Sequence, residues 1–373
     1  MSEDDYGRSE EYLANMARRR QQAQTPAARP GTLAITHVKT CFGDVPGPRW
    51  RSAAWSPDGS HLALGGTHGT HGEHGALQLW DMASGHHAGM AMRHFTHDVT
   101  GPVVSLAWAT DGGHLATLET DRKSGRLAAH IRGADKGGRI IDVPAGLPAS
   151  QLAWSADGRL LALSAPEATE TVVVDAASGG VRQVLDGVGG PVAWEPDGGR
   201  LAGCAGTAVV VCDPATGQTI HRFTEHDRKP TVVAWATHGR YLAVGYGEQI
   251  RVWDAETGDW TWNMRWTMAE GDRGPDGTVN ALYWLDGGRY LIELRQRGGM
   301  QRDEAGSIAS TVTVWDITKR ALLTKLFWHT WNRHPIPLST IAVDPVRRSV
   351  TTVADLHPPD IWLLHGDLPD SIS

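Results

Sequence analysis

Apolar and polar side chains alternate in short runs along most of the chain, as in LQLWD (77–81), IRVWD (250–254) and VTVWD (312–316). Alternation with a period of two, rich in β-branched residues, is typical of short strands that bury one face. The runs are separated by Pro-Asp-Gly or Thr-Gly steps, which favour tight turns. The pattern therefore predicts an all-β protein of short antiparallel strands.

A longer unit is repeated along the chain. Six segments combine an apolar run, a tryptophan, a polar turn and a Leu-containing run: RSAAWSPDGSHLAL, VSLAWATDGGHLAT, SQLAWSADGRLLAL, GPVAWEPDGGRLAG, TVVAWATHGRYLAV and NALYWLDGGRYLIE. Their tryptophans are Trp55, Trp108, Trp154, Trp194, Trp235 and Trp284, and a degenerate seventh segment, LSTIAVDPVRRSVTTV, has Val343 in the same place. A second alternating run and turn, such as IRVWDAETG, follows five of these segments, so a unit fits four strands in roughly 40 residues.

From about Thr32 to His365 the sequence resembles the WD40 repeats, which form β-propellers. The resemblance is carried by the S-x-D-G turn, the Leu-Ala strand and the Trp-Asp-x-x-(Ser/Thr)-Gly ending, with the Trp-Asp pair intact at Trp80-Asp81, Trp253-Asp254 and Trp315-Asp316. The Gly-His pair that usually opens a WD40 repeat is not evident. The resemblance implies a seven-bladed β-propeller of four-stranded antiparallel blades, spanning residues 31–373.

The last unit has one strand too few. After residue 337 we find only LSTIAV, SVTTV and DIWLL, whereas an orphan strand, TLAITHV (32–38), precedes the first complete unit. We expect this N-terminal strand to close the last blade as its outer strand, which would hide sheet edges that invite aggregation. Residues 1–30 are expected to form a helical or disordered arm and linker, with a possible docking role.

The repeated tryptophans are expected to be core residues. Burying about 200 Å² of aromatic surface contributes roughly 5 kcal/mol at about 25 cal/mol per Å². The same role is expected for Trp80, Trp253, Trp315 and Trp362. Trp260 and Trp262 are predicted to share one face of an outer strand and to pack on a neighbouring blade. Cys204 and Cys212 fall in predicted strands and are expected to be buried thiols.

The variable connections fall into one set. If each blade zigzags outwards through strands a, b, c and d, the short a–b and c–d turns lie on one face. The long connections then open on the other face: GTHGTHGEHG, ETDRKSGR and RQRGGMQRDEAGSIAS between strands b and c, and HFTHDVTG, TMAEGDRGPDG, HTWNRHPIP and HVKTCFGDVPGPRW between strands d and a. Elaborated loops on one side of a rigid scaffold are typical of a binding surface.

The leading hypothesis for function is therefore a non-catalytic scaffold that binds a protein or peptide partner through this face. Tryptophan and arginine are common anchors of interfaces. The candidate binding residues are Trp266, Arg273, Arg295, Arg297, Trp328, Trp331, Arg333 and His97. A small-molecule ligand in the mouth of the central channel is a further prediction.

His68, His71 and His74 form a His-x-x-His-x-x-His segment on the same face. Three imidazoles with an open fourth position suit zinc or another divalent metal. The spacing fits neither a helix face nor a strand face, and the glycines make the loop costly to order, so a plain connection is the favoured interpretation. The alternative function is an enzyme, possibly metal-dependent, on this face or at the channel mouth. No other catalytic signature is found, and no cofactor is expected.

Composition restricts the classes of partner and the cellular location that can be expected. The formal charge of −7 and the pI near 6.2 show no excess of positive charge, so a nucleic-acid partner is not expected. No apolar run suits a membrane span, and the acidic start MSEDDYGRSEEY is not a secretory signal. Three cysteines without C-x-x-C spacing favour reduced thiols and a cytoplasmic location. Abundant Ala, Gly and Arg with few Lys favour a GC-rich bacterial genome.

Overall fold

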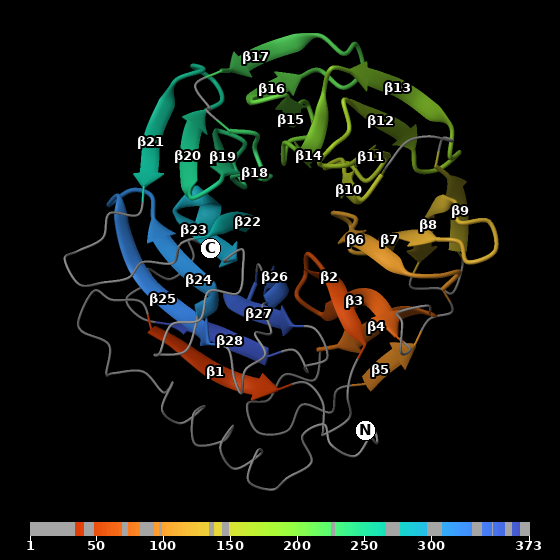
Figure 1. The fold of residues 1–373 in the computed structure, drawn as a ribbon, viewed down its shortest axis with the longest axis horizontal. Helices are drawn as coiled ribbons and strands as arrows, with labels where there is room; N and C mark the ends of the chain where they lie inside the picture. Colours follow the sequence, from red (N-terminus) through yellow and green to blue (C-terminus); the bar gives the residue numbers. More distant parts are fainter. Residues whose placement is uncertain are drawn as a thin grey trace, which may run out of the picture.

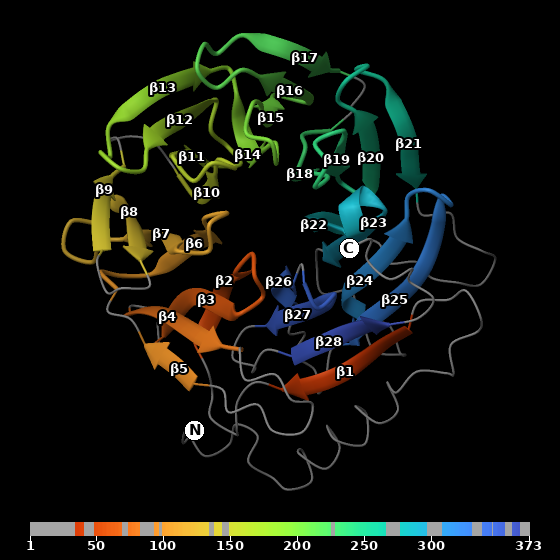
Figure 2. The same ribbon diagram turned by 180° about the vertical axis from the view of Figure 1, so that it is seen from behind.

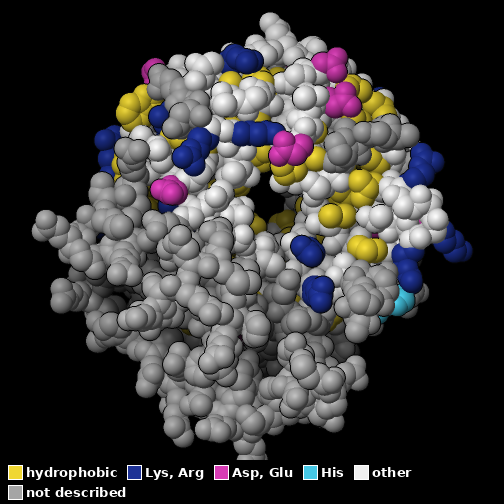
Figure 3. All heavy atoms as spheres, viewed as in Figure 1, with side chains coloured by type: hydrophobic (Ala, Val, Ile, Leu, Met, Phe, Trp, Pro, Cys, Tyr) yellow, Lys and Arg dark blue, Asp and Glu magenta, His cyan; other side chains and the backbone are white. Residues whose placement is uncertain are grey.

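Seven four-stranded antiparallel sheets surround a central axis in the computed structural model (Figure 1). The structure describes residues 34–40, 48–68, 74–82, 93–96, 99–133, 138–143, 149–224, 228–265, 277–296, 308–329, 338–344, 346–354 and 360–365, with backbone alone at 34–40, 93–96 and some strand ends. Figure 3 shows an opening at the centre of the ring. The prediction of an all-β, seven-bladed propeller is confirmed.

In blades one to six the strands follow one another outwards from the axis in chain order. Blades one to three consist of β2 (Arg49–Trp55), β3 (His61–His68), β4 (His74–Asp81) and β5 (Arg93–Thr96); β6 (Val103–Trp108), β7 (His114–Thr120), β8 (Leu127–Gly133) and β9 (Gly138–Asp142); and β10 (Gln151–Trp154), β11 (Leu160–Ser164), β12 (Glu170–Asp175) and β13 (Val181–Asp186). Blades four to six consist of β14 (Gly189–Trp194), β15 (Leu201–Ala205), β16 (Ala208–Cys212) and β17 (Thr219–Phe223); β18 (Val232–Trp235), β19 (Tyr241–Tyr246), β20 (Gln249–Asp254) and β21 (Trp260–Arg265); and β22 (Thr278–Leu285), β23 (Tyr290–Gln296), β24 (Ile308–Asp316) and β25 (Ala321–His329). A 3-10 turn, η2 (Asp286–Gly288), joins β22 to β23.

Blade seven combines strands from both ends of the described chain. Its order is β1 (Ala34–Thr40), β28 (Asp360–His365), β27 (Ser349–Ala354) and β26 (Leu338–Asp344). β1 runs antiparallel to β28, with Ala34 opposite His365 and Thr40 opposite Asp360. Figures 1 and 2 show β1 as the outermost strand of this sheet, with its start next to β25 of blade six.

The repeated tryptophans link successive blades. In five seams the indole N–H of an inner-strand tryptophan donates to the carbonyl of the alanine that precedes the tryptophan of the previous blade, at 2.9–3.1 Å. The donors are Trp108, Trp154, Trp194, Trp235 and Trp284, and the acceptors are Ala54, Ala107, Ala153, Ala193 and Ala234. Four of these donors are buried and Trp108 is partly buried, so the prediction that they are core residues is confirmed.

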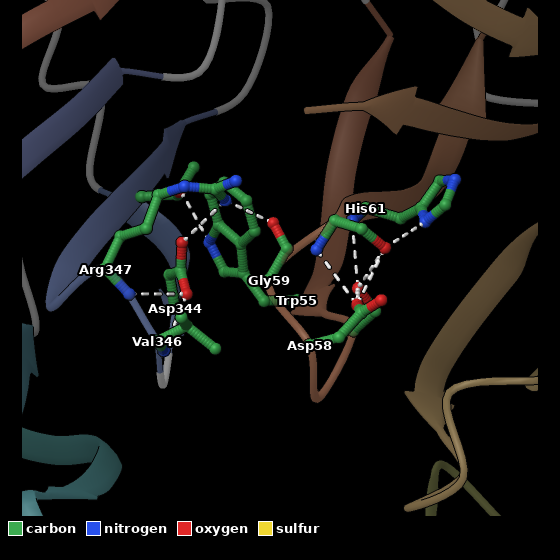
Figure 4. A network of polar contacts seen from close by, with 10 residues as sticks. Trp55, Asp58, Gly59, His61, Asp344, Val346 and Arg347 are labelled. Carbon is green, nitrogen blue, oxygen red and sulfur yellow. Dashed lines mark hydrogen bonds and ion pairs between the residues drawn. The ribbon is translucent and has the colours of Figure 1, made fainter. Parts of the chain in front are cut away.

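The two seams beside blade seven use other contacts, and at the seam with blade six Val343 has no side-chain N–H to donate. Tyr283 donates its hydroxyl to the carbonyl of Ile341 at 2.9 Å, and Trp55 donates its indole N–H to Thr351 Oγ1 at 3.0 Å. Figure 4 shows the second seam, where Arg347 of blade seven also donates to the carbonyl of Gly59 in blade one. Blade seven is therefore joined to its neighbours by side-chain contacts that differ from those of the other five seams.

The prediction for Trp260 and Trp262 is wrong in one respect. Trp262 lies opposite Val252, whereas Trp260 lies opposite Trp253, because a bulge at this point inserts one extra residue into β21. Neighbouring partners in a strand point to opposite faces, so the two tryptophans do not share a face. Trp262 packs edge-on against Trp315 of blade six, with ring centroids 5.9 Å apart, and Trp260 is 49% exposed.

Candidate functional site

The order of the strands places the connections on two faces. Since every blade starts at its inner strand and its neighbouring strands are antiparallel, the a–b and c–d turns share one face, here called the turn face. The b–c and d–a connections leave from the other, here called the insertion face. In blade one, for example, β3 ends and β4 begins on the insertion face, at His68 and His74.

On the turn face, short a–b and c–d turns satisfy their own polar groups. Asp58 Oδ1 accepts hydrogen bonds from Ser56 Oγ at 2.6 Å and from the backbone N–H of Ser60 at 2.9 Å, and these bonds lower the pKa of Asp58 to about 2. Hydrogen bonds from Ser155 and the backbone of Arg159 likewise lower the pKa of Asp157 in blade three. These carboxylates serve their turns and are poor candidates for binding or catalysis.

Most arginines of the turn face are also committed to carboxylates. The pairs are Arg159–Asp157, Arg200–Glu195, Arg240–Asp254, Arg289–Asp316, Arg347–Asp344 and Arg348–Asp286. Some of these residues also join blades: Arg200 Nη1 donates to the carbonyl of Ala255 in blade five at 2.8 Å. Most of these charged groups on the turn face therefore make contacts within or between blades.

Most binding candidates from the sequence lie outside the described residues. These are Trp266, Arg273, Arg297, Trp331, Arg333 and His97, and the structure describes only the backbone of Trp328, in β25. The strands that border them end on the insertion face, as their positions in the connections predicted. Their role as a binding surface stays a prediction.

Arg295 is the exception, and its assignment to an exposed loop is wrong. It lies in β23 and is 3% exposed. Its Nε donates to Glu293 Oε1 at 2.7 Å, and its Nη1 donates to the carbonyl of Glu248 in blade five at 2.9 Å. The strand continues to Gln296, so the loop begins later than the sequence suggested, and Arg295 is a structural residue.

The histidine segment is shorter than its glycines suggested. β3 extends to His68 and β4 starts at His74, so these two residues lie opposite each other and their rings stack with centroids 5.0 Å apart. His74 Nδ1 lies 2.7 Å from Arg122 Nη1. A guanidinium can only donate, so this nitrogen of His74 is the acceptor.

That contact does not fit a metal ligand. A histidine that binds metal through one nitrogen normally donates the N–H of the other to a carboxylate or carbonyl. In His74 the second nitrogen accepts from a cation instead. His71 lies outside the described residues, and within those described no group of three or more His, Cys, Asp or Glu residues could hold a metal ion.

A buried polar cluster lies beneath this part of the face, and sequence reasoning missed it. Glu119 in β7 is fully buried; its Oε2 accepts from the backbone N–H of Thr100 at 2.9 Å, and its Oε1 lies 2.7 Å from Arg132 Nη2. His130 Nε2 is 3.6 Å from Glu119 Oε2, and desolvation lowers the pKa of His130. Charged residues within the apolar runs LATLET and LAAHIR were the available signal.

The comparisons with known proteins agree with the fold. Residues 217–254 match the family model described as WD domain, G-beta repeat, a stretch that includes β18, β19 and β20 of blade five. The protein is thus a seven-bladed β-propeller in which residues 217–254 match a WD40 repeat, so the resemblance noted in the sequence is confirmed for that stretch. No curated protein matches the sequence. In the described part of the chain, no helix has the length and apolar character needed to cross a membrane.

Proposed function

We propose that this protein is a non-catalytic scaffold that binds a protein or peptide partner through the insertion face. The observation that carries the proposal is the difference between the two faces. The turns of the turn face are short and bind their own polar groups, whereas the long connections open on the insertion face. Binding surfaces of rigid repeat scaffolds are commonly built from such connections.

The residue types in these connections support a protein partner. The sequence places Trp266, Trp328 and Trp331 there, along with Arg273, Arg297 and Arg333. Tryptophan and arginine are enriched among the residues that dominate binding energy at protein interfaces. Indole hydrogen bonds between blades stiffen the scaffold from which these connections leave.

The test is affinity capture of partners from an extract of the native host, followed by mass spectrometry. A Trp331→Ala/Arg297→Ala variant is compared with an Arg159→Ala/Lys319→Ala variant, which changes two exposed cations of the turn face. We expect the first variant to lose its partner and the second to retain it. Equal recovery by wild-type protein and the Trp331/Arg297 variant would refute the proposal.

A further inference from the structure

Charged side chains are unevenly distributed on the described part of the insertion face. Over blades one and two lie five cations, here called the basic surface: Arg49, Arg51, Arg122, Lys123 and Arg126. Arg49 is half-buried and the other four are exposed. Over blade three the described charges are acidic instead, at Glu167, Glu170 and Asp186, and Glu167 Oε2 is paired with Lys229 Nζ at 3.0 Å. In Figure 3, Lys and Arg side chains gather with a His side chain over blades one and two.

Backbone pairing and one side-chain contact bring most members of the basic surface together. Arg49 lies opposite Thr67 at the start of β2, next to the facing pair His68 and His74. Arg122 reaches back to His74 at 2.7 Å. Lys123 and Arg126 belong to the same turn as Arg122, which is closed by a hydrogen bond from the N–H of Asp121 to the carbonyl of Arg126 at 2.8 Å. The surface therefore crosses the seam between two blades.

These cations have no carboxylate partner among the described residues, unlike six arginines of the turn face. The nearby Asp121 uses Oδ1 to accept from the N–H and hydroxyl of Ser124, both at 2.7 Å, and from the N–H of Lys123 at 3.1 Å. Glu119 is buried below and is paired with Arg132. Apart from the attraction between Lys123 and Asp121, the described residues therefore leave the charge of the basic surface unpaired.

The backbone under the basic surface is tightly packed. A Cβ at Gly75 would overlap the carbonyl oxygen of Gly101, and a Cβ at Gly101 would overlap that of Thr120. The segment entering β6 is thus wedged between β4 of blade one and the end of β7 in blade two. Thr100 fastens it by donating its N–H and hydroxyl to Glu119. A surface held in this way is preorganised for binding.

We infer that the basic surface binds an acidic peptide segment of the partner protein; this inference rests on the proposed function. Carboxylates complement its guanidinium and ammonium groups, and Arg122 offers the forked donor geometry that suits them. A nucleic acid is a poorer match, because the chain as a whole has a formal charge of −7 and would repel a long polyanion. Such a surface chiefly speeds and orients association, while apolar anchors elsewhere supply most of the affinity.

The test measures binding of a fluorescent peptide of alternating Glu and Gly residues to the full chain by anisotropy at low salt. A matched peptide with Gln in place of Glu is the ligand control. An Arg122→Glu/Arg126→Glu variant is compared with Arg159→Glu/Lys319→Glu, which makes the same charge change on the turn face. We expect the first variant to bind about tenfold or more weakly, the second to bind like wild type, and added salt to weaken binding.

Several outcomes would overturn the inference. Equal binding of the Gln peptide, or equal loss in both variants, would show that the surface does not recognise acidic segments. Absence of binding would mean that carboxylates of the adjoining connections, such as Glu73 and Asp98, already neutralise it. Tighter binding of a single-stranded DNA, with the same sensitivity to Arg122→Glu/Arg126→Glu, would assign the surface to nucleic acid.

The basic surface could be occupied by a partner or by the acidic N-terminal residues of this same chain. A variant lacking residues 2–28 distinguishes these two occupants. If only that shortened chain binds the peptide, the surface is occupied by residues such as Glu10 and Glu11, and the assignment to a partner is overturned. Failure of the acidic-segment inference can also be distinguished from failure of the proposed scaffold function. If the peptide does not bind but Trp331→Ala/Arg297→Ala still loses the captured partner, the scaffold proposal stands and only the acidic segment is wrong.

Discussion

At the scale of single residues, the inner-strand tryptophans show how one side chain can serve both packing and polar connection. Trp194 is 7% exposed, so most of its apolar ring is removed from water. Its indole N–H also donates to the carbonyl of Ala153 in the previous blade at 3.0 Å. No other apolar side chain offers both, which explains why the repeat keeps tryptophan at a position where size alone would admit phenylalanine.

Replacement of Trp194 by Phe removes the hydrogen bond and reduces the buried ring at the same time. The variant keeps an aromatic ring but leaves the carbonyl of Ala153 without its donor, and the smaller ring leaves a gap. We expect the free energy of unfolding to fall by about 2 kcal/mol, measured by urea denaturation. Trp260→Phe is the control, since Trp260 is 49% exposed, and we expect a change within about 0.5 kcal/mol. Similar losses in both would show that the hydrogen bond contributes little.

The two described thiols are expected to be unreactive in the folded protein. Burial raises the pKa of Cys204 to about 12 and that of Cys212 to about 11. The thiolate is the reactive form, so at about pH 8 only a very small fraction of either residue can react. Titration with a thiol reagent should label Cys204 and Cys212 only after denaturation. Rapid labelling of either residue in native protein, located by peptide mapping, would contradict the described packing.

At the scale of strands, the local sequence pattern predicted which segments form strands but not the face or the exact end of each one. Period-two alternation and the Gly-containing turns are local properties, so the strands and their order could be predicted from the sequence. The bulge in β21, which separates Trp260 from Trp262, depends on pairing with β20 and leaves no local mark. The extension of β3 to His68 likewise depends on the facing His74. Of the candidate site, the sequence predicted the face but not the packing of each side chain.

Arg295 shows why a charged residue near a loop misleads. Arginine is seldom fully buried unless it is paired, so exposure was the natural expectation. Its partner, Glu293, lies two residues earlier on the same face of β23, where Thr313 Oγ1 and Trp315 Nε1 also donate to it at 2.7 and 3.0 Å. The burial of this pair depends on contacts between strands of blade six, which a single sequence does not reveal.

Breaking this pair should be far more costly than removing it. Arg295→Met leaves Glu293 charged and buried, and we expect a loss of about 3–5 kcal/mol in the free energy of unfolding. In the double variant Glu293→Gln/Arg295→Met, the amide oxygen still accepts from Thr313 and Trp315, so the loss should be smaller by about 2 kcal/mol. Urea denaturation of both variants completes the cycle with Glu293→Gln. A double variant less stable than Arg295→Met would show that the charge is satisfied in another way.

At the scale of the whole molecule, a ring of blades needs every seam, and the seam between blades seven and one is built differently from the others. Gly59 and Gly158 occupy the same turn position in blades one and three, with φ of +66° and +68°. A Cβ at Gly59 would lie 2.7 Å from Asp344 Oδ1 of blade seven, whereas a Cβ at Gly158 would meet nothing within 4 Å. The first glycine is therefore constrained by the ring, and the second only by its own turn.

The two glycines form a matched test of this seam. Alanine at either position pays the strain of a positive φ, about 1–2 kcal/mol. Gly59→Ala must also displace Asp344, whose Oδ1 accepts from the backbone N–H groups of Val346 and Arg347 at 2.8 and 3.0 Å. We expect Gly59→Ala to lower the free energy of unfolding by about 1–2 kcal/mol more than Gly158→Ala. Equal losses in chemical denaturation would mean that the seam adapts without strain.

The pairing of β1 with β28 makes residues 34–40 part of blade seven. Deleting residues 2–30 removes the acidic arm but leaves β1, so we expect an unchanged melting temperature. Deleting residues 2–40 also removes β1 and bares the backbone edge of β28, an edge that can pair with another chain. We expect this variant to melt about 5–10 °C lower and to associate, as measured by calorimetry and light scattering. If it stays monomeric with the same melting temperature, β1 contributes nothing to the ring, and three strands suffice for blade seven.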